Sequence, residues 1–536
     1  MSLTAATKSD VRERQLRYAP LNPYWWQVAH RVMPTGKRYE IMDSRRHFYM
    51  PYLYEPLCEW SKDAPRGYRQ VWSKCGQVGC TEAGIGLGLW FLDECDEGVM
   101  YGLPTEDAIK SFVQARVDPS VRKSPYIEAA FRDTDNTDVK LAWGQAWYFR
   151  GAVSRSKLRE IPVGLLVRDE YGEMPEEGRE LMPARLGASR FKWVLDLGNP
   201  RYPESGIDLE YKRGDQSVWK VKCEACGAEE EPCWPESVKW SSQASSGAGQ
   251  DGGDRAEGVY ALVCPHCGER VERFNGRWVP TNPGAPYRSF RMSQLISPAV
   301  EPWEIAAAWG AAQGNTTRLQ EFYNSVLGLP YAPEGARLTD EVLNALPRGP
   351  EMVMGWKKPT CMGVDVGAEN HVEIRKMGGG ILWAGTLDWT EMSRAMVNYN
   401  VAQCGIDIAP ETTKAKEFAR DHSGKVTLIR YNPSPTATGQ SVKEEDGVSV
   451  LTVARTEVID TAFARILNGE EEVPVNAPAD WFAHMKAQTR IVVRDGRREY
   501  AKWDDQGKPD HYAHAFVYSE LVRDEATAWE RAGVFV

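Results

Sequence analysis

Four cysteines have the spacing of a metal site. Of the 11 cysteines in the chain, Cys223 and Cys226 form one pair and Cys264 and Cys267 another, with two residues inside each pair. A glycine follows each pair and permits the tight turn that points both sulfurs at one ion. Four such thiolates predict a closed, tetrahedral, structural Zn²⁺ site. Four unrelated buried thiols are the alternative, and a redox pair is disfavoured because two matched pairs fit a metal better.

A glycine-bearing loop between a short strand, expected at 69–72, and an apolar helix could bind phosphate. In the usual phosphate loop, GxxxxGK[ST], backbone amides cradle the phosphates and the lysine reaches over them. Here the loop ends in Gly-Cys-Thr, so this lysine is absent, and a lysine at the start of the loop could fold back over the phosphates. The threonine keeps the hydroxyl that binds Mg²⁺. An ordinary strand–turn–helix is the alternative. The residues of the predicted ATP site are Lys74, Gly76, Gly79, Cys80 and Thr81.

Two adjacent acids close an apolar strand at residues 161–170. In a hydrolytic ATPase, Asp169 would hold Mg²⁺ and Glu170 would orient or deprotonate the attacking water. A strand that ends in solvated acids is the alternative for this motif alone, but the preceding phosphate loop favours the catalytic interpretation. A third strand, at 191–200, ends in Gly198-Asn199-Pro200, where a segment could sense the γ-phosphate.

Three further acids indicate a second metal-dependent site. Asp365 and Asp407 each lie in an apolar strand, where a carboxylate is costly unless it is paired or bound to metal. Asp510 precedes an apolar helix. Acids on two strands and at a helix start are typical of an RNase H-like nuclease, in which two divalent ions activate water and stabilise the leaving oxygen. Each acid alone could instead be a strand-end carboxylate or a helix cap.

These residues require an α/β architecture with several segments. Strand-like and helical stretches alternate from about residue 68 to 200, as in a P-loop-type domain with a mostly parallel sheet. A Gly/Ser-rich stretch lies between the two cysteine pairs and predicts a loop within a small zinc ribbon. The predicted segments are an N-terminal arm (1–50), a P-loop ATPase domain (51–215), a zinc-ribbon insertion (216–285), a helical segment with a linker (286–357) and an RNase H-like α/β nuclease domain (358–536).

The composition is that of a globular protein. The chain has 536 residues, of which 42% are hydrophobic, and a net charge of −10. This balance speaks weakly against a protein that coats nucleic acid by bulk charge, but it allows a local basic channel or acids that hold Mg²⁺. No apolar run reaches the roughly 18 residues of a membrane span, and the first residues lack the apolar core of a secretory signal. We expect an intracellular protein without membrane contact.

Several motifs, taken in their order and spacing, resemble the large terminase subunit of tailed bacteriophages, most closely the lambda-type branch. They are the loop KCGQVGCTE, the segment that follows it at 99–125, the Asp-Glu strand and FYNSVLGLPY at 322–331. The resemblance covers roughly residues 40–530. The family is a DNA-packaging motor, in which an ATPase drives duplex DNA into an empty capsid and a nuclease cuts the concatemer.

Carried over by position, this resemblance implies that Lys74, Gly79 and Thr81 form the phosphate loop, with Asp169 and Glu170 as its acids and 198–200 as a coupling motif. It implies ATP with Mg²⁺ in the ATPase and Mg²⁺ or Mn²⁺ at Asp365, Asp407 and Asp510. A cysteine-rich insertion also fits this branch. A trans-acting arginine is expected in such a motor, and Arg155 and Arg159 are the candidates.

This chain departs from the family pattern at one position. Related enzymes often have a further aspartate where this chain has His514. The third nuclease ligand is therefore the most open assignment, with Asp504 or Asp505 as alternatives to Asp510. His511 or His514 could assist at the site, or could cap and pack the helix. A hairpin expected at 490–503 could steer DNA toward it.

The expected partners are double-stranded DNA, the portal protein, the small terminase subunit and further copies in a ring on the procapsid. The expected location is the host cytoplasm, with transient attachment to the procapsid. Two other functions stay open at this point. One is a helicase-like DNA repair ATPase with a fused nuclease, and the other is a non-enzymatic zinc-containing DNA-binding protein.

Overall fold

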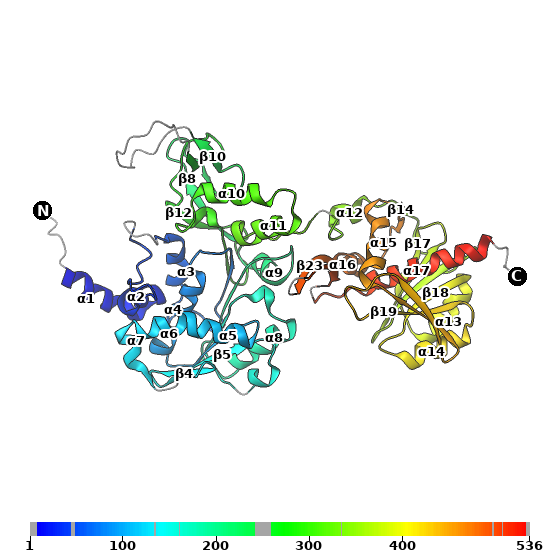
Figure 1. The fold of residues 1–536 in the computed structure, drawn as a ribbon, viewed down its shortest axis with the longest axis horizontal. Coiled ribbons are helices and arrows are strands. Elements are labelled where there is room, and N and C mark those ends of the chain that lie inside the picture. Colours follow the sequence, from blue (N-terminus) through cyan, green and yellow to red (C-terminus); the bar gives the residue numbers. More distant parts are fainter. Residues whose placement is uncertain are drawn as a thin grey trace. The chain divides into compact units, whose positions relative to one another are not determined.

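The chain forms two compact units, Met1–Tyr331 and Ala332–Val536 (Figure 1). The computed structural model describes residues 8–43, 49–132, 136–159, 161–241, 259–333, 335–495, 498–505 and 507–531. Within these ranges no helix combines the length and apolar character needed to cross a membrane.

The first unit is built on an 11-stranded sheet, counted over the described residues, with the order β12-β8-β13-β1-β7-β6-β2-β5-β4-β3 and β9 paired to β8. The strands from β8 to β5 run parallel to one another, as predicted, and antiparallel strands lie at both edges. Their bounds are β1 (Arg69–Lys74), β2 (Val99–Leu103), β3 (Phe131–Arg132), β4 (Val139–Ala142), β5 (Gln145–Gly151), β6 (Leu165–Arg168), β7 (Trp193–Gly198), β8 (Ser217–Lys222), β9 (Glu229–Glu230), β12 (Gly276–Pro280) and β13 (Arg288–Met292).

Helices cover both faces of this sheet. The largest apolar cluster joins α2, α3, α4 and α5 to one face, and smaller clusters pack α8 and α9 against the other. The helices are α1 (Lys8–Tyr18), α2 (Pro23–His30), α3 (Tyr54–Cys58), α4 (Cys80–Glu94), α5 (Glu106–Phe112), α6 (Asp118–Arg122), α7 (Pro125–Ala130), α8 (Glu176–Leu181), α9 (Gly206–Arg213), α10 (Pro302–Ala312) and α11 (Thr316–Glu321), with π-helical turns at Val113–Val117 and Phe322–Leu327. A separate hairpin pairs β10 (Val238–Ser241) with β11 (Val259–Leu262).

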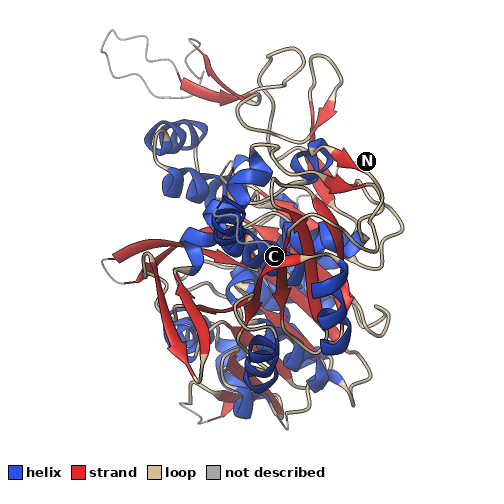
Figure 2. Cartoon of the chain, turned by 90° about the vertical axis from the view of Figure 1, so that its right-hand side faces the viewer, coloured by secondary structure: helices blue, strands red, loops and turns tan. Residues whose placement is uncertain are grey.

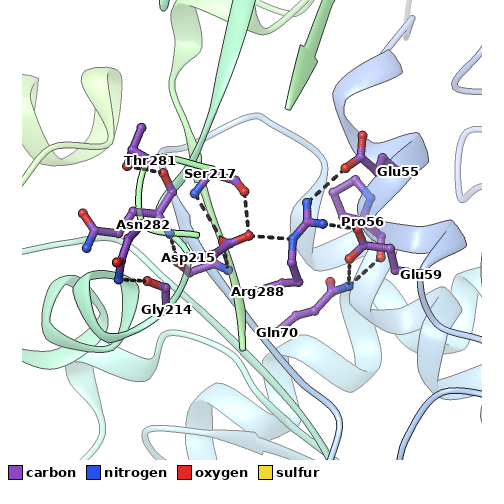
Figure 3. Close-up of polar contacts among 12 residues, drawn as sticks. Glu55, Pro56, Glu59, Gln70, Gly214, Asp215, Ser217, Thr281, Asn282 and Arg288 are labelled. Atoms are coloured by element: carbon purple, nitrogen blue, oxygen red, sulfur yellow. Dashed lines mark hydrogen bonds and ion pairs between the residues drawn. The ribbon is translucent and has the colours of Figure 1, made fainter. Parts of the chain in front are cut away.

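A charged cluster ties the amino ends of β1 and β13 to α3 (Figure 3). Arg288 lies 3.0 Å from Glu55, 2.7 Å from Glu59 and 2.8 Å from Asp215. Burial raises the pKa of Glu59 to about 7, although Arg288 acts in the opposite direction. Because β1 and β13 run from this cluster to the glycine-bearing loop, the cluster fixes the strands that carry that loop.

The second unit has a seven-stranded sheet in its described part, with the order β17-β16-β15-β18-β19-β21-β20. Strands β17, β16 and β15 are antiparallel, and β15, β18, β19 and β21 are parallel, which is the RNase H-like arrangement that the sequence predicts. The bounds are β15 (Thr360–Asp365), β16 (Asn370–Lys376), β17 (Ile381–Leu387), β18 (Val401–Asp407), β19 (Val426–Tyr431), β20 (Gln440–Glu445) and β21 (Val448–Val453); two short pairs are β14 (Arg348–Gly349) with β22 (Val473–Pro474) and β23 (Thr489–Asp495) with β24 (Arg498–Asp504).

Two apolar layers enclose this second sheet. Figure 2 shows the helices of the chain in blue and its strands in red. One layer packs α13 and α14 on one face, and the other packs α12, α15, α16 and α17 on the opposite face. The helices are α12 (Asp340–Ala345), α13 (Trp389–Asn398), α14 (Thr412–Asp421), α15 (Arg455–Leu467), α16 (Ala479–Ala487) and α17 (His511–Arg531).

The segments differ in two places from those expected. Strands β8 and β12 pair into the large sheet, so the stretch 216–285 is not separate from the first unit. The stretch 330–358, expected as a linker, belongs to the second unit from Ala332 onward, where Leu338, Leu343 and Leu346 are buried in the core. Prolines and turn residues indicate short elements, but they do not show that a segment lies outside a core. The expected hairpin is present as β23–β24, and its tip at 496–497 lies outside the described residues.

Candidate functional sites

The glycine-bearing loop joins β1 to α4 at the carboxyl edge of the parallel strands. Gly79 caps α4 with a φ of 75°, and a β-carbon there would lie 2.7 Å from the sulfur of Met50, so only glycine fits. The first amides of α4, from Cys80 onward, have no acceptor within the helix and can bind an anion. The Cys80 side chain itself is buried against Met292, at 3.1 Å between the sulfurs, so it fills the core.

The segment 322–331 and the nearby Ser297 hold this loop through hydrogen bonds to its backbone. The amide of Gly76 donates to the carbonyl oxygen of Ser325 at 2.9 Å, and Ser297 donates its hydroxyl to the carbonyl of Gln77 at 2.7 Å. Gly328 has a φ of 66°, and a β-carbon there would lie 2.6 Å from the carbonyl oxygen of Met292. The FYNSVLGLPY motif is therefore a structural support of the loop, and the amide of Gly76 is engaged in it.

Lys74 and the two acids that directly follow β6 meet at this loop. The Nζ atom of Lys74 lies 2.9 Å from Oε1 of Glu170 and 3.5 Å from Oδ1 of Asp169. Thr81 donates its hydroxyl to Oδ2 of Asp169 at 2.9 Å. Strand β7 separates β1 from β6, but because all three are parallel, their carboxyl ends place these four side chains together.

Burial and charge set the chemistry of this cluster. Burial alone would lower the pKa of Lys74, but the charges of Asp169 and Glu170 outweigh it, so the pKa is raised and the ammonium group is retained. Asp169 is 2% exposed, whereas the side chain of Glu170, although paired with Lys74, is 42% exposed. Tyr101, which the sequence analysis missed, donates its hydroxyl to Oδ2 of Asp169 at 2.9 Å.

The end of β7 contacts the turn that follows Glu170. A β-carbon on Gly198 would lie 3.0 Å from the amide nitrogen of Tyr171, and Asn199 donates to the hydroxyl of Ser325 at 3.4 Å. Residues 198–200 therefore lie between the acidic turn and the segment that supports the phosphate loop. A movement of the acidic turn can therefore reach the segment that supports the loop through residues 198–200, and a movement of that segment can reach the turn.

A cavity of about 600 Å³ lies beside the loop. Its lining includes Tyr39, Ile41 and Met50 from the N-terminal segment and Gln77 and Gly79 from the loop. The fully buried guanidinium group of Arg31 fixes the neighbouring first turn of α4. It lies 2.5 Å from the Glu82 carboxylate and donates to the Glu82 carbonyl oxygen at 2.5 Å.

The four predicted cysteines converge on one point. Among the described residues, they are the only group of three or more His, Cys, Asp or Glu side chains whose ligand atoms all lie within 4.8 Å of one another. The sulfurs of Cys223 and Cys267 are 3.6 Å apart, and those of Cys226 and Cys264 are 3.7 Å apart. A tetrahedral ion with Zn–S bonds of about 2.3 Å has S···S edges of about 3.8 Å, so the set fits zinc. Two further residues with ligand-type side chains lie nearby, His266 inside the second cysteine pair and Cys233 after the first pair, and they contact Glu230 and Ser237 respectively.

Asp365 and Asp407 lie at the carboxyl ends of the adjacent parallel strands β15 and β18. Each follows the last register pair of these strands, Val364 with Ile406. The two carboxylates face α17, because His511 contacts Oδ2 of Asp365 at 2.9 Å and Tyr518 donates to Oδ2 of Asp407 at 3.0 Å. Burial raises the pKa of Asp407, and the charge of Asp365 raises it further.

Asp510 immediately precedes α17 and is held by α17 and its neighbours. Its Oδ2 atom lies 2.9 Å from Nε2 of His514 and also accepts a hydrogen bond from Gln488. Burial alone would raise the pKa of Asp510, but the hydrogen bond and charge of His514, with Arg455 and Gln488, lower it overall. The alternative ligands are engaged locally, since Asp504 pairs with Lys502 at 2.7 Å and Asp505 accepts from the Gly507 amide at 2.8 Å.

Two facing glycines let α17 approach the sheet. Gly363 and Gly405 are register partners on β15 and β18. A β-carbon on Gly363 would lie 1.9 Å from the carbonyl oxygen of Ala515, and one on Gly405 would lie 2.5 Å from that of Tyr518. Glycine within a strand marks such a close approach, and this signal was present in the sequence but was not used.

The carboxylates of Asp365, Asp407 and Asp510 are ligands that suit a hard divalent cation. The carboxylates of Asp365, which is buried, and Asp407, which is half-buried, disfavour each other's charge, and a cation between them would remove this cost. The Oε1 atom of the fully buried Gln488 has no hydrogen-bond partner among the described residues, so a neutral oxygen donor lies beside Asp510. Carboxylate and amide oxygens are ligands that Mg²⁺ and Mn²⁺ prefer.

The role of Arg155 or Arg159 as the trans-acting arginine stays a prediction. Arg155 follows β5, whose carboxyl end lies at the same sheet edge as that of β6, but its exposed side chain pairs with Glu177. Arg159 is exposed on the same turn.

Comparison with known proteins gives a consistent result along the chain. The family model "Phage terminase large subunit gpA, ATPase domain" matches residues 44–280, and "Terminase large subunit gpA, endonuclease domain" matches residues 287–381. The first stretch contains the loop, the two acids and the four cysteines. The second stretch contains Asp365, whereas Asp407 and Asp510 lie beyond it.

Curated relatives and solved structures agree with these matches. The chain is 23% identical over 369 residues to the terminase large subunit of Enterobacteria phage P21, covering 60% of this chain and 55% of the relative. It is 20% identical over 290 residues to that of Escherichia phage lambda, covering 51% and 39%. The matches thus span about half of the length of these relatives, or less. The crystal structure of the HK97 bacteriophage large terminase shares the fold, with a TM-score of 0.52, 10% identity, and coverage of 93% of this chain and 98% of that one.

Proposed function

The chain belongs to the family of phage terminase large subunits of the gpA type, and on this premise we propose that it is a viral DNA-packaging motor subunit. It would hydrolyse ATP to move double-stranded DNA into a procapsid, and it would cut concatemeric DNA at a separate two-metal endonuclease site. The observation that carries this proposal is the placement of acids in both units: Asp169 and Glu170 lie against Lys74 at the loop, and Asp365 and Asp407 end adjacent parallel strands of an RNase H-like sheet.

The first cluster suits ATP hydrolysis. The free amides at the start of α4 and the ammonium group of Lys74 would bind the phosphates, which requires Lys74 to turn from Glu170 toward the ligand. Thr81 and Asp169 would hold Mg²⁺, which would neutralise charge that develops on the phosphates. Glu170, exposed at the site and released from Lys74, would then orient the attacking water.

The cavity beside the loop suits the nucleoside. It opens between the N-terminal segment and the loop, and its lining combines apolar side chains with the ring of Tyr39. A base bound there would contact residues 33–41, which follow Arg31, and Arg31 holds Glu82, the residue directly after Thr81. Nucleotide binding would thereby order the first turn of α4.

Residues 198–200 would couple hydrolysis to motion. They contact both the turn after Glu170 and Ser325, which supports the loop. Loss of the γ-phosphate would change the contacts on one side of this segment and so bias its position. The arginine that completes the site from a neighbouring copy stays a proposal, with Arg155 and Arg159 as candidates.

The second cluster suits phosphodiester cleavage. Asp365, Asp407 and Asp510 would hold two Mg²⁺ or Mn²⁺ ions, which would activate water and stabilise the leaving oxygen. The four cysteines would bind a structural Zn²⁺ that links β8 to the segment before β12. The proposed partners are double-stranded DNA, the portal protein, the small terminase subunit and further copies in a ring, with the host cytoplasm and the procapsid as locations.

Paired variants test the two-site assignment. Glu170→Gln should abolish ATP hydrolysis and leave Mn²⁺-dependent plasmid cleavage within twofold of wild type. Asp365→Asn should abolish cleavage and leave ATP hydrolysis intact. Both activities are measured on the same preparation. Wild-type behaviour of both variants in both assays would refute the proposal.

Two alternatives are less well supported. A helicase-like repair ATPase with a fused nuclease would share both activities, and it would be distinguished by strand separation without a procapsid. A non-enzymatic zinc protein would show neither activity.

A further inference from the structure

Arg455 lies at the edge of the second sheet that carries the candidate nuclease site. Strands β15, β18, β19 and β21 are parallel, so their carboxyl ends share one edge. Asp365 and Asp407 end β15 and β18 there, and β21 ends at Val453, two residues before Arg455. Arg455 begins α15, and its guanidinium group lies over the ring of Tyr431, the last residue of β19, at 5.5 Å from the ring centroid.

The guanidinium group of Arg455 reaches the part of the site that Asp510 occupies. Its Nη2 atom lies 3.4 Å from Nε2 of His514, and the same His514 atom lies 2.9 Å from Oδ2 of Asp510. Only the edge of one imidazole ring therefore lies between Arg455 and a carboxylate that is a proposed metal ligand. A substrate bound to a cation at Asp510 would pass close to this guanidinium group.

Arg455 forms no ion pair with any acid in the described part of the chain, and its buried Nε atom has no hydrogen-bond partner there. Other half-buried arginines of this unit differ, since Arg465 pairs with Glu470 at 3.2 Å and Arg490 pairs with Asp460 at 2.8 Å. A guanidinium group is always charged and carries five N–H donors. Because a partly buried cation without a counter-charge is costly, this side chain is suited to an anion from outside the protein.

The start of α15 adds backbone amides at the same place. Its N-cap residue, Ala454, provides no side-chain acceptor, so the first amides of the helix are available to an anion. The nearby carboxylate of Glu457 accepts a hydrogen bond from the amide of Gly439 at 2.7 Å, which engages it with the loop before β20. The free amides would add to the attraction that Arg455 exerts on a negatively charged group.

We propose that Arg455 binds a phosphate group of the DNA strand next to the phosphate that is cut. This inference rests on the proposed nuclease function and names a residue that holds the substrate in that site. The formal charges favour a second phosphate. Two divalent ions would exceed the three carboxylates by one positive charge, which the phosphate that is cut balances, and Arg455 supplies one positive charge more. A guanidinium–phosphate contact is charge-assisted and positions DNA without reading its sequence.

The test measures plasmid cleavage by the full chain at saturating Mn²⁺, with the KM for DNA determined at several salt concentrations. In Arg455→Gln, KM should rise by about 10-fold or more, because a hydrogen bond to a charged group is lost, and kcat should stay within about twofold of wild type. Each phosphate contact contributes about 0.9 to the slope of log KM against log salt concentration, so this slope should fall by about 1. Arg455→Lys keeps the charge and should keep the wild-type slope.

Arg394→Gln is the matched control. It removes the same charge from an exposed position on α13, which packs on the face of the sheet opposite α17, and it should keep the wild-type KM and salt slope. If Arg455→Gln fails to fold, Arg455→Met, which keeps the packing against Tyr431 without the charge, takes its place. If wild type cuts no plasmid with Mn²⁺, the proposed nuclease function itself is wrong. If wild type cuts and the uncharged variant keeps the wild-type KM or salt slope, the inference is overturned and the nuclease proposal stands.

Discussion

Substituting Gly363 with alanine tests whether the close approach of α17 assembles the nuclease site. The added β-carbon would lie 1.9 Å from the carbonyl oxygen of Ala515 and 2.5 Å from the amide nitrogen of Ser519. Both are backbone atoms of α17, so no side-chain rotation relieves the clash. Restoring an ordinary contact of about 3.4 Å requires the helix to move by about 1.5 Å relative to β15.

This displacement is large compared with catalytic tolerances. Helix α17 carries His511, His514 and Tyr518, and Asp510 directly precedes it. A misplacement of about 1 Å can cost about 100-fold in rate. Mn²⁺-dependent plasmid cleavage by Gly363→Ala should therefore fall by about 100-fold or more, and overpacking should lower the stability of the second unit by at least about 1–3 kcal/mol.

The assay compares plasmid cleavage and ATP hydrolysis on one preparation. ATP hydrolysis should stay within twofold of wild type, because the phosphate loop belongs to the other compact unit. Gly378→Ala is the control, since a β-carbon there meets no atom within 4 Å. Cleavage by Gly363→Ala at the wild-type rate, with the same melting temperature, would show that α17 does not position the site.

Three further perturbations have defined outcomes. Because burial raises the pKa of Glu59 to about 7, the stability contributed by the protonated Glu59 carboxyl is present below pH 4.5 and is lost as the pH rises through 7. The unfolding free energy of Glu59→Gln should therefore increase relative to that of wild type by about 2–3 kcal/mol between pH 5 and pH 8. Denaturant unfolding measures both proteins at the two pH values, and an equal difference at both would contradict this expectation. Removing zinc with a chelator, or Cys226→Ser, should lower the melting temperature of the first unit only, with zinc content measured in parallel; an unchanged melting temperature after complete loss of zinc would argue against a structural ion. Tyr101→Phe removes the buried hydrogen bond to Asp169 and should raise the Mg²⁺ concentration needed for ATP hydrolysis by about 10-fold, whereas an unchanged Mg²⁺ dependence would exclude this role.

The sequence alone predicted those parts of the sites that are formed by consecutive residues. The two cysteine pairs and their following glycines predicted the four-sulfur cluster, because each knuckle is formed by consecutive residues. The apolar strand before Asp169 and the loop after Lys74 predicted both elements of the first site. The alternation of strands and helices predicted two α/β units, since central strands such as β2 and β15 are buried along their whole length.

Only the tertiary structure shows which residues become neighbours when strands from distant parts of the chain pair with one another. The sheet order brings β1 and β6 to the same edge on either side of β7, which places Lys74 against Glu170. It also decided that 332–357 belongs to a core, because burial depends on partners such as α15 that lie more than a hundred residues further along. Two partners of the carboxylates, Tyr101 and Tyr518, have no sequence pattern of their own. Their roles arise only when separate elements pack closely enough for one hydroxyl to reach one oxygen.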